Sequence, residues 1–335
     1  MTGTAKKPLV SVVICSYNRR ALLRDCLTSL FTQTFPKDDY EIIVVDDGST
    51  DGTQALLEEM AQKPGAPLRA LRQENKGSAA ARNLGIANAQ GQIIASIDDD
   101  CVATASWIEN AVPYFTERDI VGVQGQTLPA EPVRLHFFPP RFSYTLEVTG
   151  SVWTHPTCNM FYRKQAILEV GGFNEEFRMP GPEDADLAFR LEEKGQIVFS
   201  PQVLVYHAVF YDTLAERLRF MRRYQYEPIL IREHPQLRKD LPLGFIYSKE
   251  VVHVPFFVAA FLAALLATLL RASLLPAAIL ALVWAIVYLW SNVVVDRQVR
   301  LFPLRVALAP IKLLLHSTKL YYHLLGSIRY RSLIV

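Results

Sequence analysis

Strand and helix patterns alternate along the N-terminal part of the chain, and this alternation constrains the fold more than any other feature. Short apolar runs occur at residues 9–14, 41–45, 68–71 and 92–97, and segments with apolar residues at helical spacing separate them. Parallel strands need a crossover, usually a helix, and strands that are buried on both faces are apolar throughout. The pattern therefore predicts an α/β fold with a mostly parallel sheet and helices on both of its faces.

Polar side chains follow three of these strands at the point where each strand ends. They lie at Ser16–Asn18, Asp46–Asp47 and Asp98–Asp100. Ligands of such sheets bind beyond the carboxyl ends of the strands, and five carboxylates along one edge would repel one another. A divalent cation would remove the repulsion and join the carboxylates to substrate phosphates. Aspartate also ends strands and begins turns, which explains the pair more easily than the three consecutive residues.

A second interpretation of the acidic turn is an EF-hand calcium loop, because residues 47–58 approximate its pattern. An EF-hand loop follows a helix, whereas residues 41–45 predict a strand. We therefore expect a strand-to-helix turn in which Thr50 or Asp51 caps the helix.

Six segments, taken in order, resemble the successive motifs of family 2 glycosyltransferases. They are CSYNR (15–19), VVDDGSTDGT (44–53), NKGSAAARNLGIANAQG (75–91), SIDDD (96–100), GGFNEEF (171–177) and GPEDADLAFRL (181–191). The resemblance covers about residues 8–210. It implies a Rossmann-like GT-A fold, a nucleotide-sugar donor, a Mg²⁺ or Mn²⁺ ion and inversion at the anomeric carbon.

The resemblance assigns donor-binding roles to residues on the first strands. Asp47, or its neighbour Asp46, would accept a hydrogen bond from the nucleobase, in a pocket that Tyr17 lines. Arg82 would lie near the donor diphosphate or the base.

The metal site is implied by the D-x-D-like segment. Asp98 and Asp99 would face the ribose and the sugar, and Asp100 would ligate the metal. His207 follows another predicted strand and resembles the late histidine that completes the metal site in many such enzymes. A histidine whose hydrogen bonds are satisfied at a strand end is an equally good interpretation of His207.

Glu183 and Asp184 are the residues that the resemblance places on the acceptor side of the reaction. The resemblance makes Asp184 the general base, a role that typically contributes about 10²–10⁴-fold to the rate. Glu183 and Asp186 would raise its pKa by repulsion. The same acids also suit an ordinary helix start, since Pro182 precedes them and acids are favoured in a first turn. Residues 127–157, including Trp153, are expected to shape the acceptor pocket.

Two apolar runs near the C-terminus, residues 251–270 and 272–295, contain no charged side chain. About 20 helical residues span the roughly 30 Å core of a bilayer, so the runs predict a transmembrane helical hairpin; a buried helix pair is the alternative. Basic residues flank the hairpin on both sides and only Arg271 lies in its loop. The positive-inside rule then predicts a multi-pass protein of the cytoplasmic membrane with its catalytic domain and both termini in the cytosol.

The C-terminal segment predicts a basic amphipathic helix. Its basic side chains fall on one stripe in otherwise apolar sequence, at Lys312, His316, Lys319 and His323. Such a helix suits a membrane surface, with anionic lipid favoured; packing against the catalytic domain is the alternative.

The expected organisation has four parts. They are a GT-A catalytic domain (1–210), a basic juxtamembrane segment (211–250), the transmembrane hairpin (251–295) and the interfacial tail (296–335). The four cysteines are scattered and match neither a disulfide framework nor a metal-ligand spacing. The net charge of +2 gives no reason to expect nucleic acid as a partner.

The expected function is a metal-dependent, membrane-anchored, inverting glycosyltransferase that adds one sugar to a hydroxyl of a lipid-linked acceptor. The Q-x-x-R-W segment of processive relatives is absent. A polyprenyl-phosphate sugar synthase is the main alternative. A membrane-tethered nucleotidyltransferase is disfavoured because the first strand leads into CSYNRR, which lacks a glycine-rich phosphate loop. An inactive binding module is disfavoured because no motif acid is missing.

Overall fold

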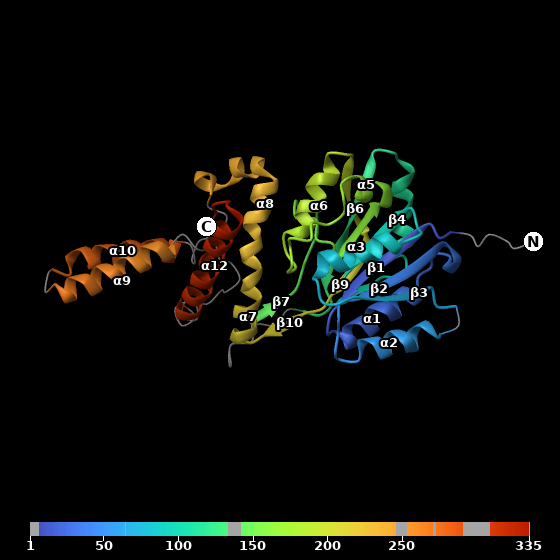
Figure 1. Cartoon of the computed structure of the whole chain (residues 1–335), viewed down its shortest axis with the longest axis horizontal. Helices are drawn as coiled ribbons and strands as arrows, with labels where there is room; N and C mark the ends of the chain where they lie inside the picture. Colours follow the sequence, from blue (N-terminus) through green and yellow to red (C-terminus); the bar gives the residue numbers. More distant parts are fainter. Residues whose placement is uncertain are drawn as a thin grey trace, which may run out of the picture. The chain divides into compact units, whose positions relative to one another are not determined.

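The computed structural model describes residues 7–63, 65–132, 142–245, 253–270, 273–290 and 309–334. The chain divides into two compact units, Met1–Leu214 and Ala215–Val335. Both are coloured along the sequence in Figure 1.

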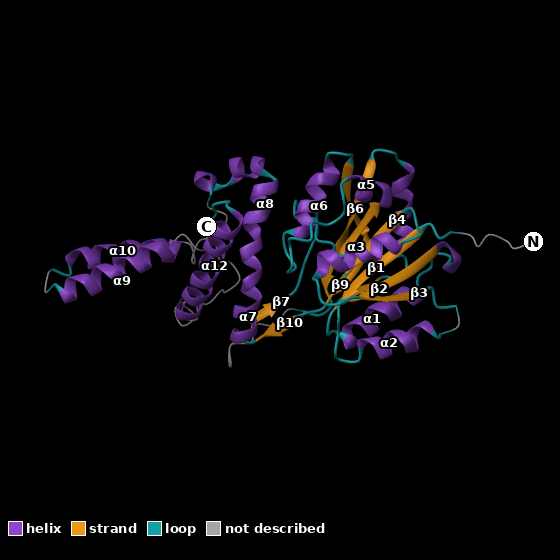
Figure 2. Ribbon diagram, in the orientation of Figure 1, coloured by secondary structure: helices purple, strands orange, loops and turns teal. Residues whose placement is uncertain are grey.

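An eight-stranded sheet forms the centre of the first unit (Figure 2), in the order β3-β2-β1-β4-β8-β6-β9-β5. Its strands are β1 (Val10–Ser16), β2 (Tyr40–Asp46), β3 (Leu68–Arg72), β4 (Ile93–Ile97), β5 (Cys101–Ala103), β6 (Ile120–Pro129), β8 (Asn159–Arg163) and β9 (Gln196–His207). The first four strands pair in parallel, as do β6 and β9, while β8 and β5 run antiparallel to their neighbours. A short antiparallel pair, β7 (Phe142–Tyr144) and β10 (Phe210–Asp212), lies outside this sheet. The mostly parallel sheet is confirmed.

Helices cover both faces of the sheet, as Figure 1 shows. They are α1 (Arg20–Phe31), η1 (Lys37–Asp39), α2 (Thr53–Ala61), α3 (Ser78–Asn88), α4 (Trp107–Ala111), η2 (Val112–Thr116), α5 (Lys164–Glu169) and α6 (Glu183–Glu192). Successive residues of a strand point to opposite faces, so Val12 on β1 joins Leu23 of α1 in one apolar cluster. Val13 joins Ile86 of α3 and Leu187 of α6 in the other. The α/β layering is therefore confirmed.

The acidic turn after β2 leads into α2, and no helix precedes it. Asp51 Oδ1 accepts from the backbone N–H of Thr53, the first residue of α2, at 3.1 Å. Asp51 Oδ2 accepts from the N–H of Arg20 at 2.9 Å. The turn is thus the expected strand-to-helix connection, and the calcium-loop interpretation is excluded by its context.

The second unit is helical within the described residues. Its elements are α7 (Leu214–Phe220), η3 (Met221–Tyr226), α8 (Glu227–Glu233), η4 (Pro235–Asp240), η5 (Pro242–Gly244), α9 (His253–Leu269), α10 (Leu275–Trp290) and α12 (Ala309–Tyr330). The apolar helices α9 and α10 pack against each other, and α12 packs against η3 and α8.

The expected membrane hairpin is contradicted. No helix in the described ranges has both the length and the apolar character needed to cross a membrane. The helices α9 and α10 have 17 and 16 residues, which gives roughly 25 Å each against the roughly 30 Å of a bilayer core. One physical reason lies at the turn, where Ser273 Oγ accepts from the N–H of Leu275 at 3.1 Å and α10 begins only there. The predicted multi-pass localisation is therefore wrong.

Parts of the predicted hairpin, residues 251–252, 271–272 and 291–295, lie outside the described residues. So do residues 296–308 of the predicted tail.

The basic stripe on α12 faces protein. The side chain of His323 is fully buried and its Nε2 contacts the carboxylate of Glu227. Lys319 Nζ lies 4.5 Å from the centroid of the Tyr224 ring. Both partners belong to η3 and α8, so α12 is a packing helix of the second unit. The expected interfacial orientation, with this stripe turned to lipid headgroups, is not what the structure shows.

We expect Gly326→Ala to destabilise the second unit. A Cβ on Gly326 would overlap the backbone carbonyl of Gln225, and a forced fit of this kind costs about 1–3 kcal/mol. Alanine favours the helix by only about 1 kcal/mol over glycine, so the net change should lower the free energy of unfolding in a denaturant titration. Gly150→Ala is the control, because its Cβ meets nothing within 4 Å. Unchanged stability of Gly326→Ala would contradict this packing of α12.

Candidate active site

Arg82 on α3 brings the ends of two distant motifs together. Its NH2 donates to Asp98 Oδ1 at 2.9 Å, and its NH1 donates to Glu183 Oε1 at 3.1 Å. The same NH1 lies 3.4 Å from Asp184 Oδ1. The guanidinium side chain is 6% exposed. A buried cation with three carboxylates around it holds the end of β4 against the start of α6, so the predicted residues of both motifs do lie in one site.

The remaining acids of the SIDDD segment surround Arg19. Its NH1 donates to Asp100 Oδ2 at 2.7 Å and to Asp99 Oδ1 at 3.1 Å. Ser16 Oγ donates to Asp99 Oδ2 at 2.7 Å. Burial raises the pKa of Asp99 to about 7, although the charge of Arg19 acts in the opposite direction. The ends of β1 and β4 therefore meet at the sheet edge, as the sequence predicted.

Asp46 and Asp47 are buried, and their carboxylates accept hydrogen bonds from other groups of the protein. Asp46 binds the N–H of Ser49 and the guanidinium of Arg72. Asp47 accepts from Gln73 Nε2 at 2.7 Å and from two backbone N–H groups, those of Lys76 and Gly77, at 2.9 Å each. An ionised carboxylate offers about four acceptor positions, so Asp47 keeps roughly one for a ligand. Tyr17, expected beside it, is 49% exposed.

Glu183 and Asp184, at the start of α6, have different environments. Glu183 has a side chain that is 1% exposed and accepts from Ser78 Oγ at 3.1 Å as well as from Arg82. Asp184 has a side chain that is 14% exposed. Its oxygens accept from Thr157 Oγ1 at 2.6 Å and Thr157 N–H at 2.9 Å. Asp184 is therefore oriented by Thr157 and still open to solvent.

The pKa of Asp184 is raised to about 7. Burial is the largest cause, the charge of Glu183 adds to it, and Arg82 and the Thr157 hydrogen bond lower it. A carboxylate that titrates near neutral pH suits proton abstraction near neutral pH.

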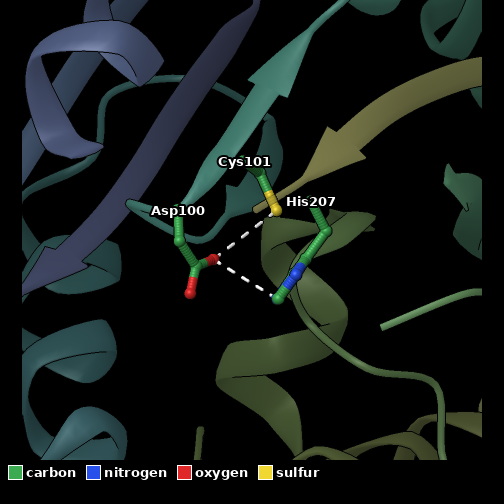
Figure 3. Close-up of side chains that lie close together, drawn as sticks. All are labelled: Asp100, Cys101 and His207. Atoms are coloured by element: carbon green, nitrogen blue, oxygen red, sulfur yellow. Dashed lines mark hydrogen bonds and ion pairs between the residues drawn. The ribbon is translucent and has the colours of Figure 1, made fainter. Parts of the chain in front are cut away.

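Asp100, Cys101 and His207 form a compact group (Figure 3). Asp100 Oδ1 lies 3.5 Å from His207 Nε2 and 3.7 Å from Cys101 Sγ. The three candidate ligand atoms lie within 4.8 Å of one another, and all three residues are buried. Carboxylate, imidazole and thiol are all metal ligands, so the residues fit a divalent cation. The structure brings the two predicted ligands, Asp100 and His207, together.

Comparison with known proteins decides the family. The model described as "Glycosyl transferase family group 2" matches residues 93–295, more than half of the chain, and the model "Glycosyl transferase family 2" matches residues 11–174. The chain belongs to glycosyltransferase family 2. It carries a family 2 glycosyltransferase domain, and the membership expected from the six motifs is confirmed.

Curated relatives of this glycosyltransferase share parts of its sequence. Glycosyltransferase AglE of Haloferax volcanii is 33% identical over 177 residues, 51% of this chain and 57% of the relative. The beta-monoglucosyldiacylglycerol synthase of Nostoc sp. is 29% identical over 55% of this chain and 41% of the relative. A glucosyl-dolichyl phosphate glucuronosyltransferase of Haloferax volcanii is 27% identical over 60% of this chain and 69% of the relative. The chain spans about half the length of curated relatives that it matches.

Solved structures of the same fold include a mannosyltransferase from Pyrobaculum calidifontis in complex with GDP-Man and Mn²⁺. It has a TM-score of 0.58 and 21% identity, covering 94% of this chain and 88% of that one. Residues 1–349 of S. aureus TarS in complex with UDP-GlcNAc give a TM-score of 0.51 and 20% identity, covering 68% and 66%. At these identities the likeness concerns the fold alone, and the expected GT-A-like fold is confirmed.

Three residues of the site were not singled out from the sequence. Arg19 lies in the first motif. A basic residue next to strand ends that carry several acids could have indicated its contact with Asp99 and Asp100. Cys101 follows the three aspartates but reaches His207 only through the β5–β9 pairing, in which the two residues are direct partners. Thr157 is 27 residues from Asp184, and no local pattern marks it.

Proposed function

We propose that this glycosyltransferase moves one sugar from a nucleotide-diphosphate sugar to a hydroxyl of a lipid-linked acceptor, with inversion. The observation that carries the proposal is the Arg82 cluster, which links Asp98 on the donor side to Asp184 on the acceptor side. An inverting transfer needs the donor and a base for the acceptor on opposite sides of one anomeric carbon.

The donor would lie along the ends of β1, β2 and β4. Tyr17 offers an exposed ring to a nucleobase, and Asp47 retains acceptor capacity for a base N–H. Asp98 and Asp99 would bind ribose and sugar hydroxyls. Arg82 would hold the Asp98 carboxylate in position through its hydrogen bond. The mannosyltransferase and the TarS fragment, which have this fold, bind GDP-Man and UDP-GlcNAc.

Mg²⁺ or Mn²⁺ would be held by Asp100 and His207. When bound, such an ion offsets the charge that develops on the departing diphosphate. Arg19 already neutralises part of the charge on Asp99 and Asp100. The mannosyltransferase neighbour was solved with Mn²⁺.

Asp184 would be the general base, and Glu183 its support. Glu183 is almost completely enclosed and its oxygens are taken by Arg82, Ser78 and the N–H of Gly181. Asp184 is more exposed, and Thr157 fixes its orientation. A positioned carboxylate can take the proton of the acceptor hydroxyl as the new glycosidic bond forms.

The acceptor would lie along the segment that includes Trp153 and Thr157. Trp153 is 53% exposed and stacks on Phe189 of α6, with ring centroids 6.0 Å apart and an interplanar angle of 14°. His155 Nε2 contacts Glu192 Oε1 at 3.1 Å, so alternate residues of this segment hold it along α6. The half-exposed ring of Trp153 therefore packs on α6, the helix that also carries Asp184. Residues 133–141, part of the predicted acceptor region, lie outside the described residues.

The lipid character of the acceptor is supported by two relatives. Their names describe transfer to diacylglycerol-based and dolichyl phosphate-based lipids. Anionic lipid as a further partner of α12 has no support in the packing of that helix.

The test is to incubate the purified protein with a panel of nucleotide sugars and Mn²⁺ and to measure nucleoside diphosphate release. One donor should be hydrolysed slowly, and a lipid-linked acceptor should accelerate release and yield a glycolipid. A product with the sugar on the phosphate of a bare polyprenyl phosphate would favour the polyprenyl-phosphate sugar synthase. Absence of release with every donor and acceptor would refute the proposal.

The transfer rate should depend on pH through Asp184. A base acts when deprotonated, so the rate should fall as the pH drops through about 7, the pKa of Asp184, and reach a plateau above it. Asp99 has a pKa of about 7 as well, and Thr157→Val separates the two. Removing the Thr157 hydroxyl deletes a hydrogen bond that lowers the pKa of Asp184, so the midpoint should rise. An unchanged midpoint would assign the profile to another group.

A further inference from the structure

We propose that Cys101 is a third protein ligand of the metal site and that the site suits a four-coordinate, thiophilic ion of the Zn²⁺ class better than octahedral Mg²⁺. The inference rests on the proposed function only in taking Asp100 and His207 as metal ligands. It adds the sulfur donor and the coordination geometry.

The distances within the group are compatible with a tetrahedral site, and all three ligand atoms lie within 4.8 Å of one another. In a tetrahedral Zn²⁺ site, with Zn–S about 2.3 Å and Zn–O and Zn–N about 2.0 Å, neighbouring S and O ligands lie about 3.5 Å apart and N and O about 3.3 Å. Around octahedral Mg²⁺ at about 2.0–2.1 Å, neighbouring ligands lie about 2.9 Å apart. Asp100 Oδ1 lies 3.7 Å from Cys101 Sγ and 3.5 Å from His207 Nε2. Both spacings are close to the tetrahedral values and wider than the octahedral one.

His207 presents a lone pair to the site. Its Nδ1 lies 2.7 Å from the carbonyl oxygen of Ala208, which can only accept, so Nδ1 carries the proton. The Thr145 hydroxyl lies 3.2 Å from Nδ1 and can share its proton as a second acceptor. The N–H of Leu146 approaches Nδ1 at 3.5 Å, a distance too long to compete. In the neutral ring Nε2 is then an acceptor, and it faces the acceptor oxygen of Asp100. A histidine that donates its other N–H to a backbone carbonyl is typical of metal ligands, and Nε2 faces Asp100 Oδ1 at 3.5 Å, where a cation would bind both atoms.

The position of Cys101 follows from the sheet. Cys101 on β5 is the direct partner of His207 on β9, and side chains of paired residues lie on the same face. Figure 3 shows the sulfur and the imidazole directed to the same carboxylate oxygen. On metal binding the thiol would lose its proton to solvent while the S–metal bond forms.

Three protein ligands leave one open position, the pattern of catalytic zinc sites. That position would be available to a diphosphate oxygen of the donor. A given protein site generally binds Co²⁺ and Zn²⁺ more tightly than Mn²⁺. A sulfur ligand strengthens this preference for Zn²⁺. Zn²⁺ should therefore displace Mn²⁺ from this site.

The experiment uses the purified full chain, stripped of metal with a chelator and titrated with Co²⁺ alone. The wild type should develop a sulfur-to-cobalt charge-transfer band in the near ultraviolet, together with the intense visible bands of four-coordinate cobalt. Cys101→Ser should lose the charge-transfer band and weaken Zn²⁺ binding by more than the roughly 10–100-fold that loss of a residue supporting a ligand costs. Its Mn²⁺ affinity should change much less.

Cys26→Ser is the matched control. Cys26 is a buried cysteine whose Sγ donates to the carbonyl of Asp98 at 3.6 Å, and its replacement should keep the band. If Cys101→Ser does not fold, X-ray absorption spectroscopy of the Zn²⁺-loaded wild type can still test sulfur ligation. We expect it to show a sulfur atom about 2.3 Å from the zinc.

A wild-type cobalt spectrum without the charge-transfer band, or a zinc shell of oxygen and nitrogen only, would overturn the inference. The proposed function and the metal assignment can be refuted independently of each other. Cobalt–sulfur ligation without turnover of any nucleotide sugar would refute the transfer reaction and leave the metal assignment intact. Mn²⁺-dependent transfer with no sulfur ligation would do the opposite.

Discussion

Replacing Asp184 with asparagine should lower sugar transfer by roughly 10²–10⁴-fold, the usual contribution of a general base, while nucleotide-sugar affinity persists. The amide keeps the size of the side chain and its carbonyl oxygen can still accept from Thr157. It cannot take a proton from the acceptor hydroxyl. Single-turnover transfer and donor binding by calorimetry, measured on the same preparation, separate the loss of chemistry from a loss of binding.

Glu183→Gln is the matched variant, since it removes the neighbouring carboxylate and keeps its volume. Glu183 is enclosed by Arg82, Ser78 and the Gly181 N–H, so the change should weaken the Arg82 cluster and lower stability more than it lowers transfer at saturating acceptor. The roles of the two acids would have to be exchanged if Glu183→Gln were folded and inactive and Asp184→Asn retained transfer.

The sheet and its acidic edge were predictable because their determinants are local. The apolar strand β1 leads directly into Ser16, and β4 leads directly into Asp98–Asp100. Parallel strands place their carboxyl ends on one side, so proximity of these side chains follows from fold class alone. The Ser16–Asp99 hydrogen bond of 2.7 Å is the outcome.

Contacts that depend on strand order could not be predicted in the same way. The antiparallel strand β8 lies between β4 and β6, and the segment before it brings Thr157 to Asp184. The β5–β9 ladder sets Cys101 opposite His207. Both arrangements join residues far apart in sequence, and no periodicity in either segment names the partner.

The C-terminal prediction failed for a different reason. Hydropathy counts apolar residues in a run, but a helix can be shorter than the run. In the described residues α9 ends at Leu269 and α10 begins at Leu275. On α12 the stripe of basic residues has the same spacing whether it meets headgroups or protein, and only the Glu227–His323 contact distinguishes the two.

The metal site gives the second large effect. Asp100→Ala should abolish metal-dependent donor binding and reduce turnover by at least roughly 10²-fold, because a bound cation supplies several kcal/mol of transition-state stabilisation and each tenfold in rate is about 1.4 kcal/mol. One oxygen of Asp100 faces His207 and Cys101 while the other binds Arg19. His207→Ala should have the same effect less severely, since the carboxylate ligand, Asp100, remains.

The control must separate loss of a ligand from loss of a buried ion pair. Asp186→Asn does so, because the Asp186 side chain is 2% exposed and pairs with Arg190 on α6, and neither residue belongs to the metal group. It should lower the free energy of unfolding and leave the Mn²⁺ dependence of donor binding unchanged. Circular dichroism should show Asp100→Ala folded, since Arg19 keeps its contact with Asp99. Full activity of Asp100→Ala in the presence of a chelator would mean that the charge on the departing diphosphate is stabilised elsewhere, with Arg19 the nearest cation able to do it.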